Sequence, residues 1–395
     1  MTDSITLIAP HLAPAAIGPR ATRSRRIARA LTDAGHRVHP VVIADPTLQH
    51  PILAAAPGTL IGAMGEPGMS SRRRLRAGLA RAAQRILPLP DAQLHWAATV
   101  LRDPALERPP SPRTTIYAVA APFSALIVGA LLARRWKAPL IGDIGDPWIG
   151  AGPAEARLAA WTMGRLDSLI VTNEATASAC RPQLAPGTRT IVAANGADRL
   201  WRAPAAPDEP PLFLQIGTLS RVRTDPVPAF RALAELDRRR LIRFRSHGEA
   251  WVPLAPDLAR YHHGVLGEDE ARNLMGSAAA VLVVGNRNPI QIPSKVYEVA
   301  RSEAWGLFVS EHQREPGAAV LRASGHGVVC ANDEEAIAAG ALTIVERERC
   351  GERPRPSADH TWEETLGRVV GLVEDRPALD RDRCEPAAEP ALSGR

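Results

Sequence analysis

The chain has few cysteines, and those it has stand far apart. Among its 395 residues they are Cys180, Cys330, Cys350 and Cys384. No two of them have the close spacing of a zinc-binding pair, and no histidine lies at ligand spacing beside them, which argues against a structural zinc site. We therefore expect incidental thiols in a reducing compartment.

Long apolar runs are also missing. The most apolar stretch, residues 118–133, is interrupted by Pro122 and Ser124 and is followed by Arg134 and Arg135. A membrane-spanning helix needs about 20 consecutive apolar residues, so none is expected. The first apolar run begins at Ile5 without the layout of a signal peptide, and the expected location is the cytoplasm.

Aromatic residues make up only 4% of the chain, and its net charge is +6. Arginines gather between Arg72 and Arg85, among Leu75, Leu79 and Ile86. This pattern predicts a basic amphipathic helix, which could rest peripherally on the inner face of a membrane. A solvated arginine face on an ordinary helix explains the same pattern, and we favour it. Because no aromatic residue stands among these arginines, no nucleic acid partner is expected.

Short apolar runs alternate with helical periodicity through most of the chain, which predicts parallel α/β sheets. Strands are expected at residues 5–9, 38–43, 115–119, 140–143, 168–172, 190–193, 212–217, 242–246, 262–264, 278–285, 307–310 and 327–330. Helices are expected at residues 21–34, 92–101, 124–135, 154–166, 175–183, 227–237, 268–277, 334–346 and 361–375, and another begins at residue 294.

The proline-rich residues 203–211 break this alternation and predict a linker. The expected fold class is therefore α/β, with two doubly wound Rossmann-like domains, residues 1–202 and 212–355, facing a ligand-binding cleft. Residues 377–395 are expected to be a disordered tail.

Residues 278–310 carry the clearest local signal of a binding site. An apolar strand is followed by a polar loop, and Ser294 is the expected N-cap of a helix that ends near Gly306. Free N–H groups at a helix start attract phosphate, Lys295 adds positive charge, and Glu298 can accept hydrogen bonds from sugar hydroxyls. The segment predicts a nucleotide-sugar site. An exposed Lys295–Glu298 ion pair, worth about 0.2–0.5 kcal/mol, is the alternative interpretation.

Several motifs, in order along residues 4–375, resemble family 4 retaining glycosyltransferases of the GT-B fold. They are Thr6-Leu7-Ile8-Ala9-Pro10-His11 with Gly18-Pro19-Arg20, Ala34-Gly35-His36-Arg37-Val38, Pro122-Phe123-Ser124, Gly142-Asp143-Ile144-Gly145-Asp146-Pro147-Trp148, Asn195-Gly196-Ala197-Asp198, Gln215-Ile216-Gly217-Thr218-Leu219, Ile292-Pro293-Ser294-Lys295-Val296-Tyr297-Glu298 and Thr361-Trp362-Glu363-Glu364. In this fold the closing helix, here within residues 356–376, returns to pack on the first domain.

The resemblance implies a donor diphosphate held by a strand end, a basic residue and a helix start, without a metal or other cofactor. The matching positions are Gly217, Thr218, Arg223, Ser294 and Lys295 for the diphosphate, Glu298 for the ribose, His263 in the base-binding loop, and Gly18 and Arg20 in the acceptor-side loop. For Arg223 and His263, a surface arginine and a strand-end histidine without a ligand remain alternative interpretations.

Two positions depart from the family pattern. The glutamate expected eight positions before Glu298 is Ile290, and Gly145 replaces an arginine. The acceptor hydroxyl needs a polar partner, and the candidate catalytic residues are Asp146 and His11. A helix-capping aspartate and a loop histidine are the alternative interpretations of these two residues.

By this resemblance we predict a glycosyltransferase that moves a hexose-type sugar from a nucleotide-sugar donor to a glycan, lipid-linked or small-molecule acceptor, with retention of configuration. The two departures favour an alternative, a non-catalytic GT-B-fold subunit that binds a nucleotide-sugar or a partner protein. An epimerase of the same fold would release sugar and nucleotide without an acceptor, and it ranks lower because its usual carboxylates are not evident.

Overall fold

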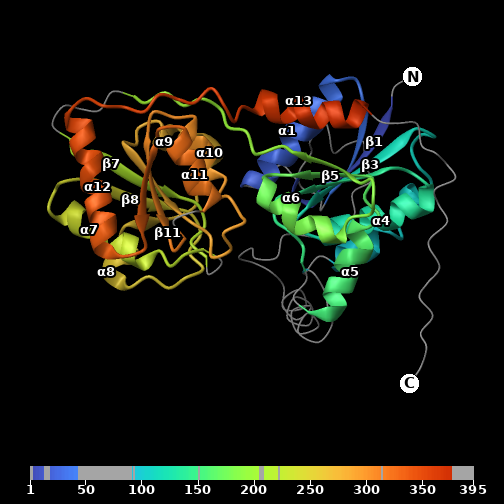
Figure 1. Ribbon diagram of the computed structural model, residues 1–395, viewed down its shortest axis with the longest axis horizontal. Coiled ribbons are helices and arrows are strands. Elements are labelled where there is room, and N and C mark those ends of the chain that lie inside the picture. Colours follow the sequence, from blue (N-terminus) through green and yellow to red (C-terminus); the bar gives the residue numbers. More distant parts are fainter. Residues whose placement is uncertain are drawn as a thin grey trace.

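Two parallel six-stranded sheets, each with helices on both faces, form the two halves of the molecule (Figure 1). The computed structural model describes residues 3–12, 18–42, 91, 94–149, 152–203, 209–220, 223–312 and 315–375. Within these ranges no helix is both long and apolar enough to cross a membrane. The expected α/β class with two doubly wound sheets is confirmed.

The first sheet has the strand order β2-β1-β3-β4-β5-β6. Its strands are β1 (Ser4–Ile8), β2 (Arg37–Val41), β3 (Thr114–Ala120), β4 (Leu140–Ile144), β5 (Ser168–Val171) and β6 (Arg189–Val192). Its helices are α1 (Pro19–Asp33), α3 (Leu94–Val100), α4 (Ser124–Trp136), α5 (Pro153–Met163) and α6 (Glu174–Cys180). The central strands β1, β3 and β4 are buried at every position because helices cover both faces, which explains why most of their residues are apolar.

The second sheet has the order β12-β11-β10-β7-β8-β9. Its strands are β7 (Leu212–Ile216), β8 (Arg243–His247), β9 (His262–His263), β10 (Ala280–Val284), β11 (Trp305–Ser310) and β12 (Gly327–Ala331). Its helices are α7 (Val227–Arg238), α8 (Pro256–Ala259), α9 (Glu268–Met275), α10 (Lys295–Ala300), α11 (Pro316–Ala323) and α12 (Glu334–Arg349). All expected strands are present in both sheets, with ends shifted by a residue or two.

Three details of the second half differ from expectation. The helix α11 was not expected, and α10 ends at Ala300 rather than near Gly306, which lies inside β11. Ser294 is not a capping residue, because its backbone is already helical and its side chain makes no capping hydrogen bond. The first turn continues from Pro293, whose carbonyl accepts a hydrogen bond from the Val296 N–H.

The last helix, α13 (Trp362–Glu374), lies beside α1 on the first half (Figure 1). Val369 and Leu372 share a hydrophobic core with Ile27 of α1 and with β1. The start of α13 rests on Gly196, where a Cβ would lie 2.5 Å from both the N and Cα atoms of Trp362. The expected basic helix near residues 72–85, most of the linker and the tail beyond residue 375 lie outside the described residues.

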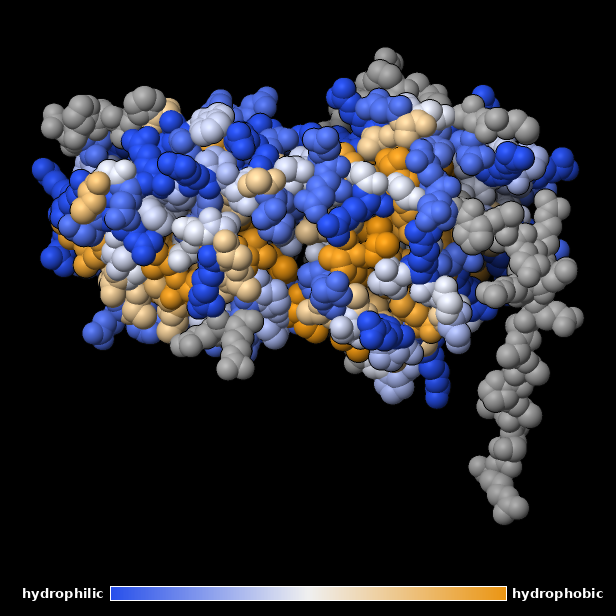
Figure 2. Space-filling view, turned by 45° about the horizontal axis from the view of Figure 1, so that its top comes forward, coloured by the Kyte–Doolittle hydropathy of each residue, from blue (hydrophilic) through white to orange (hydrophobic). Residues whose placement is uncertain are grey.

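Ion pairs connect the two halves across α1 and α9. Asp198 pairs with Arg26 and with Arg272, each at 2.7 Å, and Arg25 pairs with Glu268 at 3.1 Å. Figure 2 shows hydrophobic side chains on the walls that face each other between the halves, whereas hydrophilic side chains dominate the outer flanks. The halves therefore enclose a cleft with partly apolar walls.

Candidate functional site

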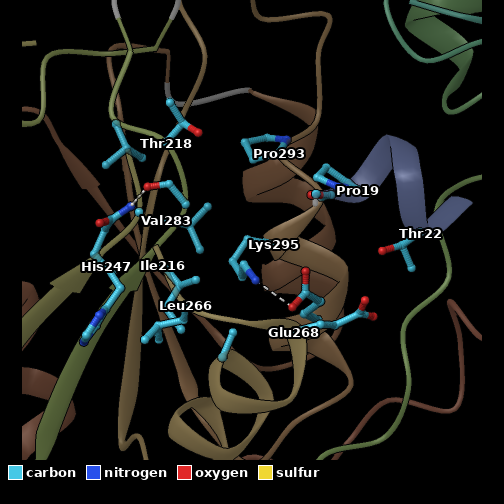
Figure 3. Close-up of a pocket in the computed structure, with 18 of the residues that line it drawn as sticks. Pro19, Thr22, Ile216, Thr218, His247, Leu266, Glu268, Val283, Pro293 and Lys295 are labelled. Atoms are coloured by element: carbon cyan, nitrogen blue, oxygen red, sulfur yellow. Dashed lines mark hydrogen bonds and ion pairs between the residues drawn. The ribbon is translucent and has the colours of Figure 1, made fainter. Parts of the chain in front are cut away.

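A pocket of about 600 Å³ lies where the carboxyl ends of β7 and β10 meet the start of α1. In the second sheet the strand order reverses between β7 and β10, and ligands of open α/β sheets bind at such a switch point. Figure 3 shows Pro19 and Thr22 of α1 on one side of the pocket, Lys295 near its middle, and Thr218 and Ile216 on the other side. The predicted residues that line the pocket are Gly18, Gly217, Thr218, Arg223, Ser294, Lys295 and Glu298.

Two glycines shape the wall after β7 and β8. Gly217 has φ +131° and Gly248 has φ +140°, in the region that side chains other than glycine rarely adopt. A Cβ on Gly248 would lie 2.3 Å from the Gly217 carbonyl oxygen, whereas a Cβ position on Gly217 meets nothing within 4 Å. The chain therefore presents bare backbone to the pocket at Gly217.

Arg223 supplies a cation at the end of β10. Its Nη1 donates to the Val284 carbonyl at 3.2 Å and to Asn286 Oδ1 at 3.3 Å. Burial lowers the pKa of the Arg223 guanidinium, and the carboxylates of Glu315 and Asp146 oppose that shift. Arg223 is thus fixed at the pocket wall with carboxylates from both halves near it.

Lys295 and Glu298 occupy the first turn of α10. Lys295 Nζ lies 2.7 Å from Glu298 Oε2, so the ion pair of the alternative interpretation is present. Both side chains also line the pocket, where they are only partly exposed. The ion pair and a nucleotide-sugar site are therefore compatible, because a bound ligand can replace each side chain as the partner of the other.

The far end of the pocket is lined by Val265 and Leu266, in the loop where a base was expected. His263 is exposed and lies outside the pocket lining. His247, which the sequence analysis did not select, lines it instead, and its ring lies 5.0 Å from that of His263. Burial lowers the pKa of His247, which favours a neutral imidazole in the pocket.

The acceptor-side candidates gather at the switch point of the first sheet, between β1 and β3. Asp146 pairs with Arg20 at 3.0 Å. The charge of its carboxylate also acts to raise the pKa of Arg223 in the other half. Burial and the neighbouring Arg20 lower the pKa of His11, which hydrogen-bonds the Ala121 backbone. Gly18 joins this cluster to the pocket, since His11, Arg20 and Asp146 themselves stand outside the pocket lining.

The contacts among several buried polar groups beside the pocket could not be identified from the sequence. Arg23 Nε lies 3.1 Å from both carboxylate oxygens of Asp143, which also accepts from the Tyr117 hydroxyl at 2.7 Å. Glu315 has no exposed surface and accepts from the Asn286 N–H at 3.0 Å. Only a charged residue inside an otherwise apolar strand, as at Asp143, could have signalled such a network.

At Ile290 and Gly145, the two departures from the family pattern, the residue present offers no charged side chain in place of the expected one. Ile290 is half-buried in the loop before α10, and its N–H donates to Asn288 Oδ1 at 3.1 Å. A Cβ on Gly145 would meet nothing within 4 Å, so open space stands where a larger side chain was expected. Among the described residues, no three His, Cys, Asp or Glu side chains gather as metal ligands do.

No protein-family model matches the chain, and no curated protein matches it in sequence. Solved structures match nearly all of it. A sucrose-phosphate synthase from Thermosynechococcus elongatus has a TM-score of 0.58 at 13% identity, covering 94% of this chain and 98% of its own. Anabaena HepE in complex with UDP and glucose has a TM-score of 0.58 at 15% identity, covering 94% and 99%. S. aureus MnaA, solved with UDP, has a TM-score of 0.54 at 12% identity, covering 94% and 96%. At such identities the likeness concerns the fold alone, and the chain has the GT-B fold.

Proposed function

We propose that the protein is a glycosyltransferase that takes a sugar from a nucleotide-sugar. The observation that carries this proposal is the convergence of Arg223, Lys295, Glu298 and the bare backbone at Gly217 on one pocket at a sheet switch point. The pocket volume of about 600 Å³ lies within the range typical of small-molecule binding sites. The HepE and MnaA structures, which share the fold, are complexes with UDP, and this supports the choice of ligand class.

In the proposed complex the diphosphate lies between Arg223 and Lys295, against the backbone of Gly217 and Thr218. Two cations that line the same pocket match the charge of a diphosphate and stabilise it as it departs from the sugar. Glu298, released from Lys295, accepts hydrogen bonds from the ribose hydroxyls. We further propose a hexosyl donor, transfer with retention and no resident metal; these finer points rest on the family resemblance.

The acceptor is proposed to enter from the first half, beside Asp146 and His11. Asp146 can accept a hydrogen bond from the acceptor hydroxyl, because it follows β4 and its carboxylate acts on Arg223 of the other half. A glycan, a lipid-linked sugar or a small molecule would satisfy this role. A cytoplasmic enzyme, with peripheral membrane contact through residues 72–85 if the acceptor is lipid-linked, is part of the same proposal.

The test is sugar release or transfer from radiolabelled UDP- and GDP-sugars, with wild-type protein and Glu298→Ala. We expect turnover of one donor that Glu298→Ala abolishes. Glu303→Ala is a matched control in the same half, since Glu303 accepts from the Arg202 N–H outside the pocket. Turnover that survives in Glu298→Ala would contradict the proposed donor site.

A non-catalytic nucleotide-sugar-binding subunit is the second candidate. Ile290 favours it, because this apolar side chain stands where an acid near the donor sugar was expected. Donor binding that depends on Glu298, without turnover under any acceptor, would identify the subunit. Release of free sugar and nucleotide without an acceptor would instead point to an epimerase or hydrolase.

A further inference from the structure

At the pocket wall, a chain of buried and partly buried hydrogen bonds ends on the Gly217 carbonyl. Gln215 Nε2 donates to that carbonyl at 3.0 Å, and Gln215 Oε1 accepts from the Ser246 hydroxyl at 2.5 Å. Ser246 Oγ lies 2.8 Å from His262 Nδ1. Gln215 and Ser246 are 5% and 0% exposed, so water cannot replace these partners.

Each link in this chain has a fixed direction. Because the Gln215 amide nitrogen faces the Gly217 carbonyl, the Gln215 amide oxygen must face Ser246. The single hydroxyl hydrogen of Ser246 is donated to that oxygen. The Ser246 oxygen can only accept from His262, and His262 must carry a proton on Nδ1. The Gly217 carbonyl, which can only accept, therefore selects the nitrogen end of the Gln215 amide, and Ser246 with His262 satisfies the oxygen end.

The Gly217 carbonyl is held from a second side. Its oxygen fills the space where Gly248 would carry a Cβ, 2.3 Å from that position. In a trans peptide the carbonyl of one residue and the N–H of the next point in opposite directions. Gln215 and Gly248 thereby fix the direction of the Thr218 N–H, which no described residue accepts. Thr218 itself lines the pocket (Figure 3).

We infer that Gln215, Ser246 and His262 form a positioning relay that presents the Thr218 N–H to the diphosphate of the ligand, an inference that rests on the proposed function. An N–H whose carbonyl is pinned cannot turn away when the pocket is empty, so little ordering is required when the ligand binds. Gln215 itself lines the pocket, but its amide nitrogen donates to Gly217 and its oxygen accepts from Ser246. All three residues are therefore positioning residues that act through the Gly217–Thr218 peptide.

The test compares ligands that differ only in the diphosphate. UDP and GDP are titrated by calorimetry, and uridine and guanosine by displacement, into wild-type protein, Gln215→Met and Ser246→Ala. Ser302→Ala removes an equally buried hydroxyl in the same half, away from the pocket, and serves as the matched control. Circular dichroism and thermal unfolding establish that each variant is folded.

We expect Gln215→Met to weaken binding of the diphosphate about tenfold, the effect of losing one charge-assisted hydrogen bond. Ser246→Ala should weaken it about threefold, because the Gln215 amide can then rotate. Nucleoside binding should stay unchanged, and Ser302→Ala should change neither ligand. Equal losses for diphosphate and nucleoside, or no loss at all, would overturn the relay while leaving the proposed function intact. If wild-type protein binds neither UDP nor GDP, the proposed function fails, and the relay fails with it.

Discussion

Asp146 stands between two arginines from different halves of the molecule. It pairs with Arg20 at 3.0 Å, and its carboxylate influences Arg223 across the cleft. If Asp146 contacts the acceptor hydroxyl, Asp146→Asn should lower kcat about 100-fold or more. Donor binding should stay within about twofold, because an amide of the same shape keeps the pocket intact. Steady-state kinetics with the donor that the radiolabel assay selects measures both quantities.

A control on the same half separates this role from general stability. Asp103→Asn changes a carboxylate that caps the short 3-10 turn Pro104–Leu106, outside the pocket lining. It should leave kcat unchanged. A loss of donor affinity in Asp146→Asn equal to the loss of kcat would show that Asp146 belongs to the donor site instead.

Glu315 gives the stability of the protein a defined pH dependence. Burial raises the pKa of its carboxyl group, while Ser310 and the Asn286 N–H offset only part of that shift. An acid whose pKa is raised by folding favours the folded state at low pH and costs stability once the pH rises through the folded pKa. Glu315→Gln should therefore be more stable than wild type at pH 8, with a difference that shrinks as the pH falls toward about 4.3, the usual pKa of glutamate.

Denaturant unfolding at several pH values measures this difference. Glutamine can keep both contacts, since its oxygen accepts from the Asn286 N–H and its amide donates to Ser310 Oγ. The comparison therefore isolates the charge. A wild type at least as stable as Glu315→Gln at pH 8 would show that Arg223 compensates the buried charge in full.

At the scale of single residues, contacts could be predicted from the sequence where the two partners are close together in the chain. The Lys295–Glu298 pair follows from two residues three apart on a helix. The contacts of Glu315 and Arg23 do not follow, because their partners are brought near by the fold. Asn195 Oδ1, for example, accepts a hydrogen bond from Arg23 at 3.2 Å, although the two residues are 172 positions apart in the sequence.

At the scale of elements, the strands could be predicted because buried parallel strands are short, mostly apolar runs. The helix α11 could not, since its eight residues are mostly small and begin at a Pro-Gly pair that resembles a turn. The early end of α10 has another cause. The expected end relied on Gly306, which lies inside β11, whereas the helix stops at Ala300 without a glycine or proline directly after it.

Gly196 decides whether α13 can dock on the first half. A Cβ there would lie 2.5 Å from backbone atoms of Trp362, and backbone cannot move aside as a flexible side chain can. We expect Gly196→Ala to destabilise the fold by about 1–3 kcal/mol. Protection of the α13 amides from hydrogen exchange should fall more than protection of the β10 amides.

Gly367 provides the opposite case within α13. A Cβ there meets nothing within 4 Å, and alanine is favoured over glycine inside a helix by about 0.5–1 kcal/mol. Gly367→Ala should therefore stabilise the protein slightly. If Gly196→Ala proved as harmless as Gly367→Ala, the close contact between Gly196 and α13 would be refuted.

At the scale of the whole molecule, the ion pairs across the cleft bias the halves toward one another. Arg25 and Glu268 are 3.1 Å apart with partly exposed side chains, a setting in which one pair contributes about 0.2–1 kcal/mol. Arg25→Glu should raise the radius of gyration measured by small-angle X-ray scattering at low salt. The exchange Arg25→Glu with Glu268→Arg should restore it, and about 1 M salt should reduce the difference because it screens exposed charges. An exchange variant as expanded as Arg25→Glu would contradict the role of this pair.

The pocket is a property of the whole molecule, which is why its membership could be predicted only in part. Gly217 and Lys295 were selected from motifs at two strand ends, and parallel sheets bring such ends together. His247 and the backbone of the Gly217–Thr218 peptide depend on loop geometry that no local pattern encodes. The site therefore divides into residues that a motif marks and residues that only the packed loops define.

Thermal unfolding with a panel of nucleotide-sugars tests the central claim most directly, because a ligand that binds only the folded state raises the melting temperature. We predict that one nucleotide-sugar raises the melting temperature of wild-type protein and leaves that of Glu298→Ala unchanged. A panel of UDP-, GDP- and other nucleotide-sugars that shifts neither protein would contradict the assignment of the cleft as a nucleotide-sugar site.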